Sequence, residues 1–551
     1  MESYKKNRRI AGEYDRGCAA ECVNGTFVGK KREGVTAFRG IPFALPPTKK
    51  LRWKKPCPVP PSEDVFEAVY NGPTSIQTKL ESERASFYRQ SEDCLYLNVW
   101  TADGYAGQSR PVMVFIHGGN YGWGGTVDPL YDGHNFVKAH PDVVLVTIAY
   151  RVGIAGFMDF SEVPGGQEYK ESGNLGLLDQ ICALRYVKDN IKAFGGNPDN
   201  VTVFGESAGG GSVSILPLIP AAKGLFRRVI AESGSVALSY SRKECLPLTR
   251  RLLEETGAKR MDDLLALTEA QLIAVNDEIG DKNNFPERDG VVLPLDLYAA
   301  YDNNEAFPVD MLAGTNADEL RYWIQDVGGL APYRVMSRAL FAAAVKGFDE
   351  ADRRRAVYFL RMQEEKGRQS KTWQITEFFN ELLFRLPALR QADAHARNGN
   401  RVYTYYWDYP SALPNLKACH AVELAYVFNN LNETIYTGDN INEELAARVQ
   451  EMWVNFAKTG DPSTEKAAWE PYSEDARNTM IIGENIRLRR NFMERERKCL
   501  YPLLKYGVNG NSYVPDKDTE RIIKAAAIAA GACAAAFILY KIISSSVKKG
   551  D

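Results

Sequence analysis

The stretch VTVFGESAG, residues 201–209, is the most informative part of the chain. A run of β-branched and aromatic side chains leads into the motif Gly-x-Ser-x-Gly, and small residues suited to the start of a helix follow. A serine hydroxyl is a weak nucleophile that needs a base and an exposed position, and a sharp strand-to-helix turn between glycines supplies the exposure. The stretch therefore predicts a nucleophilic Ser207, although a Gly/Ser-rich turn without chemistry has the same pattern.

The segments around this motif alternate between short apolar runs and longer helical patterns. Residues 112–116 (VMVFI), 143–148 (VVLVTI) and 201–204 have the composition of buried strands, and 177–194 has apolar residues at helical spacing. Strands in this order, separated by helices, favour a mostly parallel sheet with helices on both faces. The sequence therefore predicts an α/β fold.

Composition excludes several classes of partner. The 551 residues contain 68 Lys and Arg against 70 Asp and Glu, and 45% of them are hydrophobic. This balance gives no electrostatic argument for nucleic-acid binding. Nine cysteines without a C-x-x-C pair indicate neither a dense disulfide framework nor a zinc site. We expect a globular protein with no nucleic-acid partner, no metal and no cofactor.

The two ends of the chain differ from its centre. Residues 1–9 (MESYKKNRR) are basic, but no apolar segment follows them, so a cleavable signal peptide is not expected. Residues 507–520 are rich in Gly, Asn, Asp, Pro and Ser, which is typical of a linker. The sequence therefore predicts one large domain, residues 1–506, followed by a separate C-terminal segment.

An uncharged run in that segment, residues 525–540, predicts a membrane anchor. As a helix, these residues extend about 24 Å, which is short of the ~30 Å hydrocarbon core of a bilayer. Flanking isoleucines and snorkelling lysines bring 521–543 into the range of a transmembrane helix and leave 544–551 as a short basic tail. Such an anchor without a signal peptide would leave the large domain in the cytoplasm. An alanine-rich helix packed against the protein is the alternative.

A second glycine-rich element, IHGGNYG at residues 116–122, directly follows a predicted strand. Adjacent glycines at a strand end let backbone N–H groups face a cavity without Cβ atoms in the way. An acyl-transfer enzyme needs such donors where negative charge develops on the carbonyl oxygen. Together with Ser207, Gly118 and Gly119 are candidates for an oxyanion hole, whereas alone they indicate a flexible turn.

A base must accompany the serine. The histidines of the chain are His117, His134, His140, His395 and His420. In hydrolases with the chain order serine, acid, histidine, the base comes last. His420 lies in a loop before an apolar helix and fits this order best, although a lone histidine is often only structural.

The acid should fall between the serine and the histidine. Residues 312–320 (LAGTNADEL) have the pattern of a strand that ends in a polar turn with two carboxylates, Asp318 and Glu319. Either can orient an imidazole and stabilise its charged form. The pattern leaves this choice open, and an exposed acidic turn without function is the alternative.

Five stretches in register resemble the type-B carboxylesterase family, the α/β hydrolases that include carboxylesterases and cholinesterases. They are FRGIPFALPP (38–47), SEDCLYLNV (91–99), HGG (117–119), FGESAGG (204–210) and WVNFAKTGDP (453–462). The resemblance spans roughly residues 20–500. It implies an α/β-hydrolase fold, in which a central, mostly parallel twisted sheet is covered by helices on both faces, with 1–506 as the catalytic domain.

The resemblance also implies a role for each candidate residue. It assigns Ser207 as nucleophile, Glu319 as acid, His420 as base, and the amides of Gly118, Gly119 and Ala208 as the oxyanion hole. The family's acid is the glutamate of an Asn-x-Asp-Glu-Gly turn, which selects Glu319 over Asp318. Leu320 stands here in place of that glycine.

Three departures from the family bear on function. In secreted relatives the cysteine at Cys94 has an upstream disulfide partner, but residues 73–76 contain no cysteine, which fits a reducing compartment. Residues 83–90 lack the choline-stacking tryptophan of cholinesterases, so a quaternary-ammonium cage is not expected. Asn120 stands where many relatives have another glycine.

The sequence thus predicts a serine hydrolase that cleaves small-molecule carboxylic esters through an acyl-enzyme. Amidase or thioesterase activity is one alternative, because those substrates pass through the same type of intermediate. A non-catalytic, cholinesterase-like binding or adhesion module is the other, although such modules lose the serine or the histidine. Glu206, next to Ser207, either tunes the field at the site or is a structural carboxylate.

Overall fold

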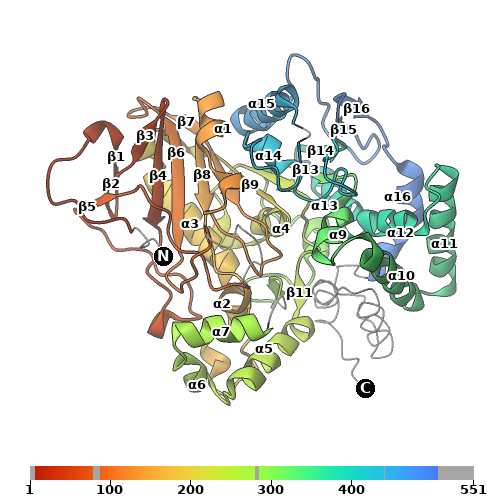
Figure 1. Ribbon diagram of the computed structural model, residues 1–551, viewed down its shortest axis with the longest axis horizontal. Helices are drawn as coiled ribbons and strands as arrows, with labels where there is room; N and C mark the ends of the chain where they lie inside the picture. The colour runs from red at the N-terminus through yellow and green to blue at the C-terminus, as the bar shows by residue number, and fades with distance from the viewer. Residues whose placement is uncertain (1–5, 79–86, 280–283, 440, 507–551) are drawn as a thin grey trace.

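A large sheet with helices on both faces forms the centre of the protein (Figure 1). The computed structural model describes residues 6–78, 87–279, 284–439 and 441–506. Within these residues the sheet has 11 strands. In sheet order they are β16 (Arg487–Arg489), β15 (Thr479–Ile482), β14 (Val402–Trp407), β13 (Asp310–Asn316), β10 (Arg228–Glu232), β9 (Gly196–Glu206), β7 (Arg110–Ile116), β8 (Val144–Ile148), β6 (Tyr96–Ala102), β4 (Val35–Pro42) and β3 (Lys30–Arg32).

The centre of this sheet is parallel and its edges are antiparallel. Every neighbouring pair from β8 through β7, β9, β10, β13 and β14 to β15 is parallel. β6, β4 and β3 on one side and β16 on the other run antiparallel to their neighbours. Parallel neighbours need crossover connections, and the helices in these crossovers cover the sheet. The predicted mostly parallel sheet is confirmed.

Successive side chains of the central strands enter two separate hydrophobic cores. In β7, Val112, Val114 and Ile116 face one core. Met113 and Phe115 face the other. Because side chains alternate across a strand, a strand covered on both faces has an uninterrupted apolar sequence. The uninterrupted apolar run at residues 112–116, predicted as a strand, is therefore a strand that is covered on both faces.

Different helices contribute to the two cores. The first core contains residues of α3 (Leu175–Asn190), α4 (Ala208–Ile215), α8 (Leu297–Asp302) and α13 (Leu386–Arg397). The second contains residues of α1 (His134–Ala139), α14 (Leu424–Val427) and α15 (Glu443–Thr459). The sheet is therefore covered on both faces, as the sequence predicts.

Further elements flank the sheet (Figure 1). One helical group consists of α5 (Arg242–Thr256), α6 (Met261–Leu265) and α7 (Glu269–Ile279), which share a core of their own. Another consists of α10 (Leu330–Lys346), α11 (Glu350–Glu365), α12 (Lys371–Asn380) and α16 (Glu494–Leu500). α2 (Gly153–Gly156) and α9 (Trp323–Asp326), like α14, are single-turn helices. One small sheet contains β1 (Ala19–Cys22), β2 (Gly25–Val28) and β5 (Val65–Glu67), and another contains β11 (Tyr240–Ser241) and β12 (Glu287–Arg288).

The strand predicted at 201–204 begins earlier in the structure. β9 starts at Gly196, which pairs with Arg110 before a shift in register between Arg110 and Val112. A β-bulge of this kind lets an irregular, polar segment join a ladder. The polar sequence of residues 196–200 (GNPDN) hides this start from pattern-based prediction.

The C-terminal segments of the prediction lie outside the described residues. These are the linker at 507–520, the transmembrane helix at 521–543 and the tail at 544–551. In the part of the chain that the structure describes, no helix is both long enough and apolar enough to cross a bilayer.

Candidate active site

Ser207 lies on a strained turn between β9 and α4. Its φ of 58° and ψ of −117° fall in a region that non-glycine residues rarely occupy. Its amide donates a hydrogen bond to the carbonyl oxygen of Glu232 at 2.8 Å. A Cβ atom on Gly205 or Gly209 would lie 2.6 or 2.0 Å from the carbonyl oxygen of Ile116. Both glycines of the motif are therefore required to bring the serine to the end of the strand.

Glu319 and His420 form a buried pair. Nδ1 of His420 lies 2.6 Å from Oε2 of Glu319, and because a carboxylate only accepts hydrogen bonds, Nδ1 carries the proton. The other oxygen of Glu319 accepts hydrogen bonds from Ser233 Oγ and from the backbone amide of Asn316, both at 2.7 Å. Glu319 is 0% and His420 4% exposed. The carboxylate is fixed in place and holds the imidazole in one tautomer.

Adjacent strands bring this pair together. The turn with Glu319 follows β13 and the loop with His420 follows β14; the two strands are parallel neighbours, so their carboxyl ends meet at one edge of the sheet. The Asp318 amide donates to the carbonyl oxygen of Ala418 at 2.9 Å, and the His420 amide to that of Glu319 at 3.3 Å. The carboxylate of Asp318 accepts instead from Arg321 Nε at 2.7 Å. Of the two candidate acids, Glu319 contacts the histidine.

The glycine turn after β7 packs against the nucleophile turn. A Cβ atom on Gly118 would lie 3.1 Å from Cβ of Ser207. Gly119 has a φ of 97°, and Asn120 a φ of 56°, a left-handed conformation that asparagine tolerates better than most residues. Ala208 is the first residue of α4, where backbone N–H groups have no partner within the helix. The three residues predicted for the oxyanion hole thus lie around Ser207.

Four of the five histidines are poorly suited to act as a general base. Burial lowers the pKa of His117 to about 4, and its Nδ1 lies 2.8 Å from the carbonyl oxygen of Gly118. Burial also lowers the pKa values of His134, His140 and His395. These four side chains stay neutral and contact no catalytic carboxylate.

Glu206 brings a second carboxylate to His420. Its Oε1 lies 3.0 Å from Nε2 of His420, although the two groups do not have the orientation of a hydrogen bond. Burial alone lowers the pKa of His420, but Glu206 and Glu319 outweigh burial and raise this pKa well above its usual value. The two carboxylates therefore stabilise the charged form of the imidazole, the form that results when the ring takes up a proton.

Comparison with known proteins shows which family this chain belongs to. A model of the carboxylesterase family matches residues 19–500. The para-nitrobenzyl esterase of Bacillus subtilis (strain 168) is 35% identical over 495 residues, covering 87% of this chain and 97% of the relative. This chain belongs to the carboxylesterase family. The family and its esterase members make it a serine hydrolase of carboxylic esters.

Other relatives of this carboxylesterase show the breadth of the family. The pyrethroid hydrolase Ces2e of Rattus norvegicus is 34% identical and covers 82% of each chain. The acetylcholinesterase of Leptinotarsa decemlineata is 28% identical and covers 80% of this chain and 78% of the relative. The crystal structure of the Geobacillus stearothermophilus carboxylesterase EST55 at pH 6.2 has a TM-score of 0.77 at 34% identity, covering 88% of this chain and 99% of that one. The α/β-hydrolase fold is therefore confirmed.

The carboxylesterase buries two more glutamates near this site that the sequence does not reveal. Burial raises the pKa of Glu232 to about 8, and its Oε1 accepts a hydrogen bond from Trp453 Nε1 at 2.8 Å. Burial and neighbouring carboxylates, Glu206 first among them, raise the pKa of Glu423 well above its usual range. At neutral pH Glu232 favours the protonated form, and burial shifts Glu423 in the same direction. Their sequence signal is only a glutamate within an apolar run, in VIAES (229–233) and AVELA (421–425).

Aromatic rings surround the imidazole of His420. The ring centre of Trp323 lies 5.5 Å from that of the imidazole in a stacked arrangement. Those of Phe384 and Tyr322 lie at 5.1 and 5.8 Å. Rings in these positions keep water away from the histidine, which strengthens its interactions with the carboxylates.

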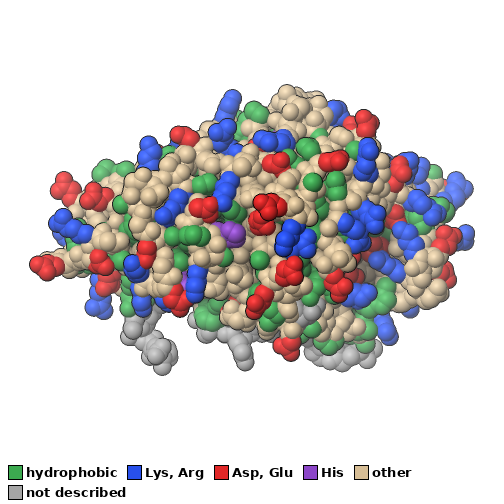
Figure 2. Space-filling view, turned by 90° about the horizontal axis from the view of Figure 1, so that it is seen from above, with side chains coloured by type: hydrophobic (Ala, Val, Ile, Leu, Met, Phe, Trp, Pro, Cys, Tyr) green, Lys and Arg blue, Asp and Glu red, His purple; other side chains and the backbone are tan. Residues whose placement is uncertain are grey.

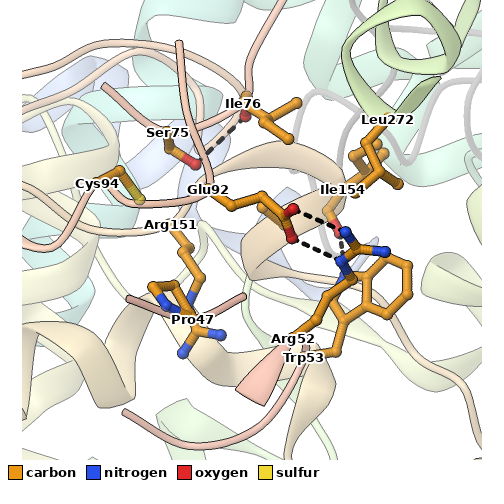
Figure 3. Close-up of a pocket in the computed structure, with 11 residues that line it drawn as sticks. Pro47, Arg52, Trp53, Ser75, Ile76, Glu92, Cys94, Arg151, Ile154 and Leu272 are labelled. Atoms are coloured by element: carbon orange, nitrogen blue, oxygen red, sulfur yellow. Dashed lines mark hydrogen bonds and ion pairs between the residues drawn. The ribbon is translucent and has the colours of Figure 1, made fainter. Parts of the chain in front are cut away.

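A small cavity of about 20 Å³ lies beside the SEDCLYLNV motif (Figure 3). Arg52 forms a two-pronged ion pair with Glu92 there, with distances of 2.6 and 2.7 Å, and donates to the carbonyl oxygen of Leu267 at 2.6 Å. Cys94 carries a free thiol, as do the other seven cysteines among the described residues. Ser75 lines the same cavity. An ion pair, and no disulfide, anchors this motif.

Proposed function

We propose that Ser207, His420 and Glu319 act as a catalytic triad that hydrolyses carboxylic esters through an acyl-enzyme. The observation that carries this proposal is the 2.6 Å contact between Nδ1 of His420 and Oε2 of the buried Glu319, at the sheet edge that also bears the strained serine turn. A buried carboxylate in this position orients the imidazole and stabilises the imidazolium that forms during the reaction.

In the first half-reaction, the serine becomes acylated. Nε2 of His420 takes the proton of the Ser207 hydroxyl while Oγ attacks the ester carbonyl carbon, and the carbonyl π electrons move to the oxygen. The tetrahedral intermediate then collapses, the bond to the alkoxy oxygen breaks, and Nε2 returns the proton to the departing alcohol. The products of this step are the free alcohol and an ester of Ser207.

In the second half-reaction, water releases the acid. His420 takes a proton from a water molecule, whose oxygen attacks the acyl carbon, and the collapse of the second intermediate returns that proton to Ser207 Oγ. In both intermediates the oxyanion accepts hydrogen bonds from the amides of Gly118, Gly119 and Ala208. Loss of one such donor costs roughly 10²–10³ in turnover in comparable enzymes.

A p-nitrophenyl ester series of increasing acyl length tests the proposal. We expect Ser207→Ala to lower kcat by roughly 10⁶-fold, because nothing else supplies the nucleophile. Ser214→Ala is the matched control: Ser214 is a buried serine of α4, the helix that follows Ser207, and its hydroxyl has no hydrogen-bond partner among the described residues. Turnover that survives Ser207→Ala, or a comparable loss in the control, would contradict the proposal.

Matched ester, thioester and anilide substrates separate the neighbouring activities. If the chain is an esterase, the ester should have the highest kcat/KM of the three substrates. The amine of an anilide is a poorer leaving group, so its departure depends more on the proton that His420 donates. A preference for the thioester or the anilide would assign the chain to that activity. Absence of turnover on all three, with a folded protein, would favour a binding module.

We also propose that residues 521–543 attach the catalytic domain, 1–506, to a membrane from its cytoplasmic side. The support for attachment is the apolar composition of this segment, and the support for the reducing side is the set of free thiols, which includes the exposed Cys57. Full-length protein should sediment with membranes, and deletion of 521–551 should release it. Full-length protein in the soluble fraction would contradict the anchor.

A further inference from the structure

The side chain of Arg321 lies where two catalytic segments meet. These are the acid turn, residues 316–322, and the histidine loop, residues 408–423. Arg321 Nε donates to Asp318 Oδ1 at 2.7 Å within the acid turn, and Nη1 donates to the carbonyl oxygen of Asn415 in the histidine loop at 2.9 Å. Arg321 is 6% exposed. One buried guanidinium therefore joins the segment that carries Glu319 to the segment that carries His420.

A third element completes this contact. The guanidinium carbon of Arg321 lies 3.8 Å from the ring centre of Trp373, a residue of α12. The same helix holds the acid turn through Asn380, whose Oδ1 accepts from the Leu320 amide at 3.0 Å and whose Nδ2 donates to the carbonyl oxygen of Ala317 at 3.2 Å. The acid turn is thus fastened both to α12 and to the histidine loop.

The histidine loop needs such fastening because its backbone is strained. Asn415, Lys417 and Ala421 have φ values of 69°, 50° and 65°, and none of them is glycine. Non-glycine residues in this region are strained and persist only where the surroundings hold them. Two of these residues flank His420, and the third accepts the Arg321 hydrogen bond. The backbone amides of Asp318 and His420 also join the two segments, but the Arg321 bond is the one that reaches the strained Asn415.

We propose that Arg321 is a positioning residue that holds the acid turn and the histidine loop in register, so that Glu319 stays in contact with Nδ1 of His420. The proposal rests on the triad proposed above. Its chemical consequence is large because a displacement of about 1 Å in a catalytic group can cost about 10²-fold in rate. Arg321 itself acts only through the two segments.

The test compares Arg321→Met with a matched control, Arg228→Met. Arg228 is also 6% exposed, donates to the carbonyl oxygen of Ala457 at 3.0 Å and pairs with Asp310 at 3.4 Å. It lies at the opposite end of β10 from the strained serine turn. We expect Arg321→Met to lower kcat by ~10- to ~100-fold with little change in KM, whereas Arg228→Met lowers Tm to a similar degree and leaves kcat within about twofold.

The pH profile of kcat/KM distinguishes positioning from a simple effect of charge. Glu206 and Glu319 raise the pKa of His420, so loss of the Glu319 contact lowers that pKa and moves the acid limb of the profile to lower pH. Removal of a nearby positive charge alone would raise the pKa and move the limb to higher pH. Arg321→Lys should recover only part of kcat, because an ammonium can pair with Asp318 but lacks the fork that also reaches Asn415.

Three results would overturn the proposal. They are unchanged kcat in Arg321→Met, an equal loss of kcat in Arg228→Met, and an acid limb that moves to higher pH. Ser207→Ala, measured alongside, separates this proposal from the triad on which it rests. Full turnover in Ser207→Ala overturns both, whereas lost turnover there together with unchanged kcat in Arg321→Met overturns the positioning role alone.

Discussion

The nucleophile turn and the acid–histidine region lie at the same edge of the sheet but are held in different ways. Backbone sterics hold the nucleophile turn, because Gly205 and Gly209 let the chain pass within contact distance of Ile116. Side-chain contacts hold Glu319 and His420, through hydrogen bonds to Ser233 and Asn316 and through the Arg321 contact. The first region therefore depends on local sequence and the second on residues far apart in the chain.

This difference determines how each region can fail. A change in the nucleophile turn displaces backbone, whereas a change around Glu319 leaves the fold and alters protonation or register. On the face that Figure 2 presents, positive and negative side chains are interspersed, without a single large charged field. In the proposed site, by contrast, the side chains of Glu206, Glu319 and His420 are 0–4% exposed.

After Ser207→Ala, the largest effect is expected from Glu319→Gln, a change in the region held by side-chain contacts. A glutamine keeps the shape of the side chain but offers an N–H to Nδ1, which favours the wrong histidine tautomer. We expect kcat to fall by about 10⁴-fold while Tm changes little. Asp318→Asn should lose much less, because Asp318 contacts Arg321 and not the histidine. Steady-state kinetics on a p-nitrophenyl ester measure both variants. Equal losses of kcat in the two would contradict the assignment of Glu319 as the acid.

A smaller loss of kcat is expected from Gly209→Ala, a change in the nucleophile turn, which backbone sterics hold in place. The added Cβ would lie 2.0 Å from the Ile116 carbonyl oxygen, so the two segments must move apart by more than 1 Å. We expect kcat to fall by about 10²-fold, together with a lower Tm. Gly12→Ala is the control, since its added Cβ meets no atom of the described residues within 4 Å. Unchanged kcat and Tm in Gly209→Ala would show that the turn tolerates a side chain.

The smallest effect is expected from Glu232→Gln, at the border of the two regions. Burial raises the pKa of Glu232 to about 8, so folding takes up a proton and stability falls as pH rises from about 4.5 to 8. Glutamine can still accept the Trp453 hydrogen bond and does not titrate. We expect the variant to gain about 1–3 °C in Tm at pH 7.5 over the wild type, and little near pH 5. A gain independent of pH would contradict this assignment.

The same contrast explains how much could be predicted from sequence. The Gly-x-Ser-x-Gly turn and the apolar strands are local patterns, and the structure contains them where they were expected. The choice between Asp318 and Glu319 needed the family resemblance, because it depends on where two neighbouring strands end. Glu232 and Glu423 were missed, since nothing local shows that a glutamate in an apolar run lies beside another buried carboxylate. The membrane span at 521–543 remains a prediction.

The triad is tested most directly by mass spectrometry of the enzyme after reaction with a fluorophosphonate ester, which traps an activated serine. The account predicts one adduct per chain, on the peptide that contains Ser207, and loss of esterase activity in proportion to labelling. Glu319→Gln should react far more slowly at the same position. An adduct on another residue, or full activity in protein labelled at Ser207, would contradict the account.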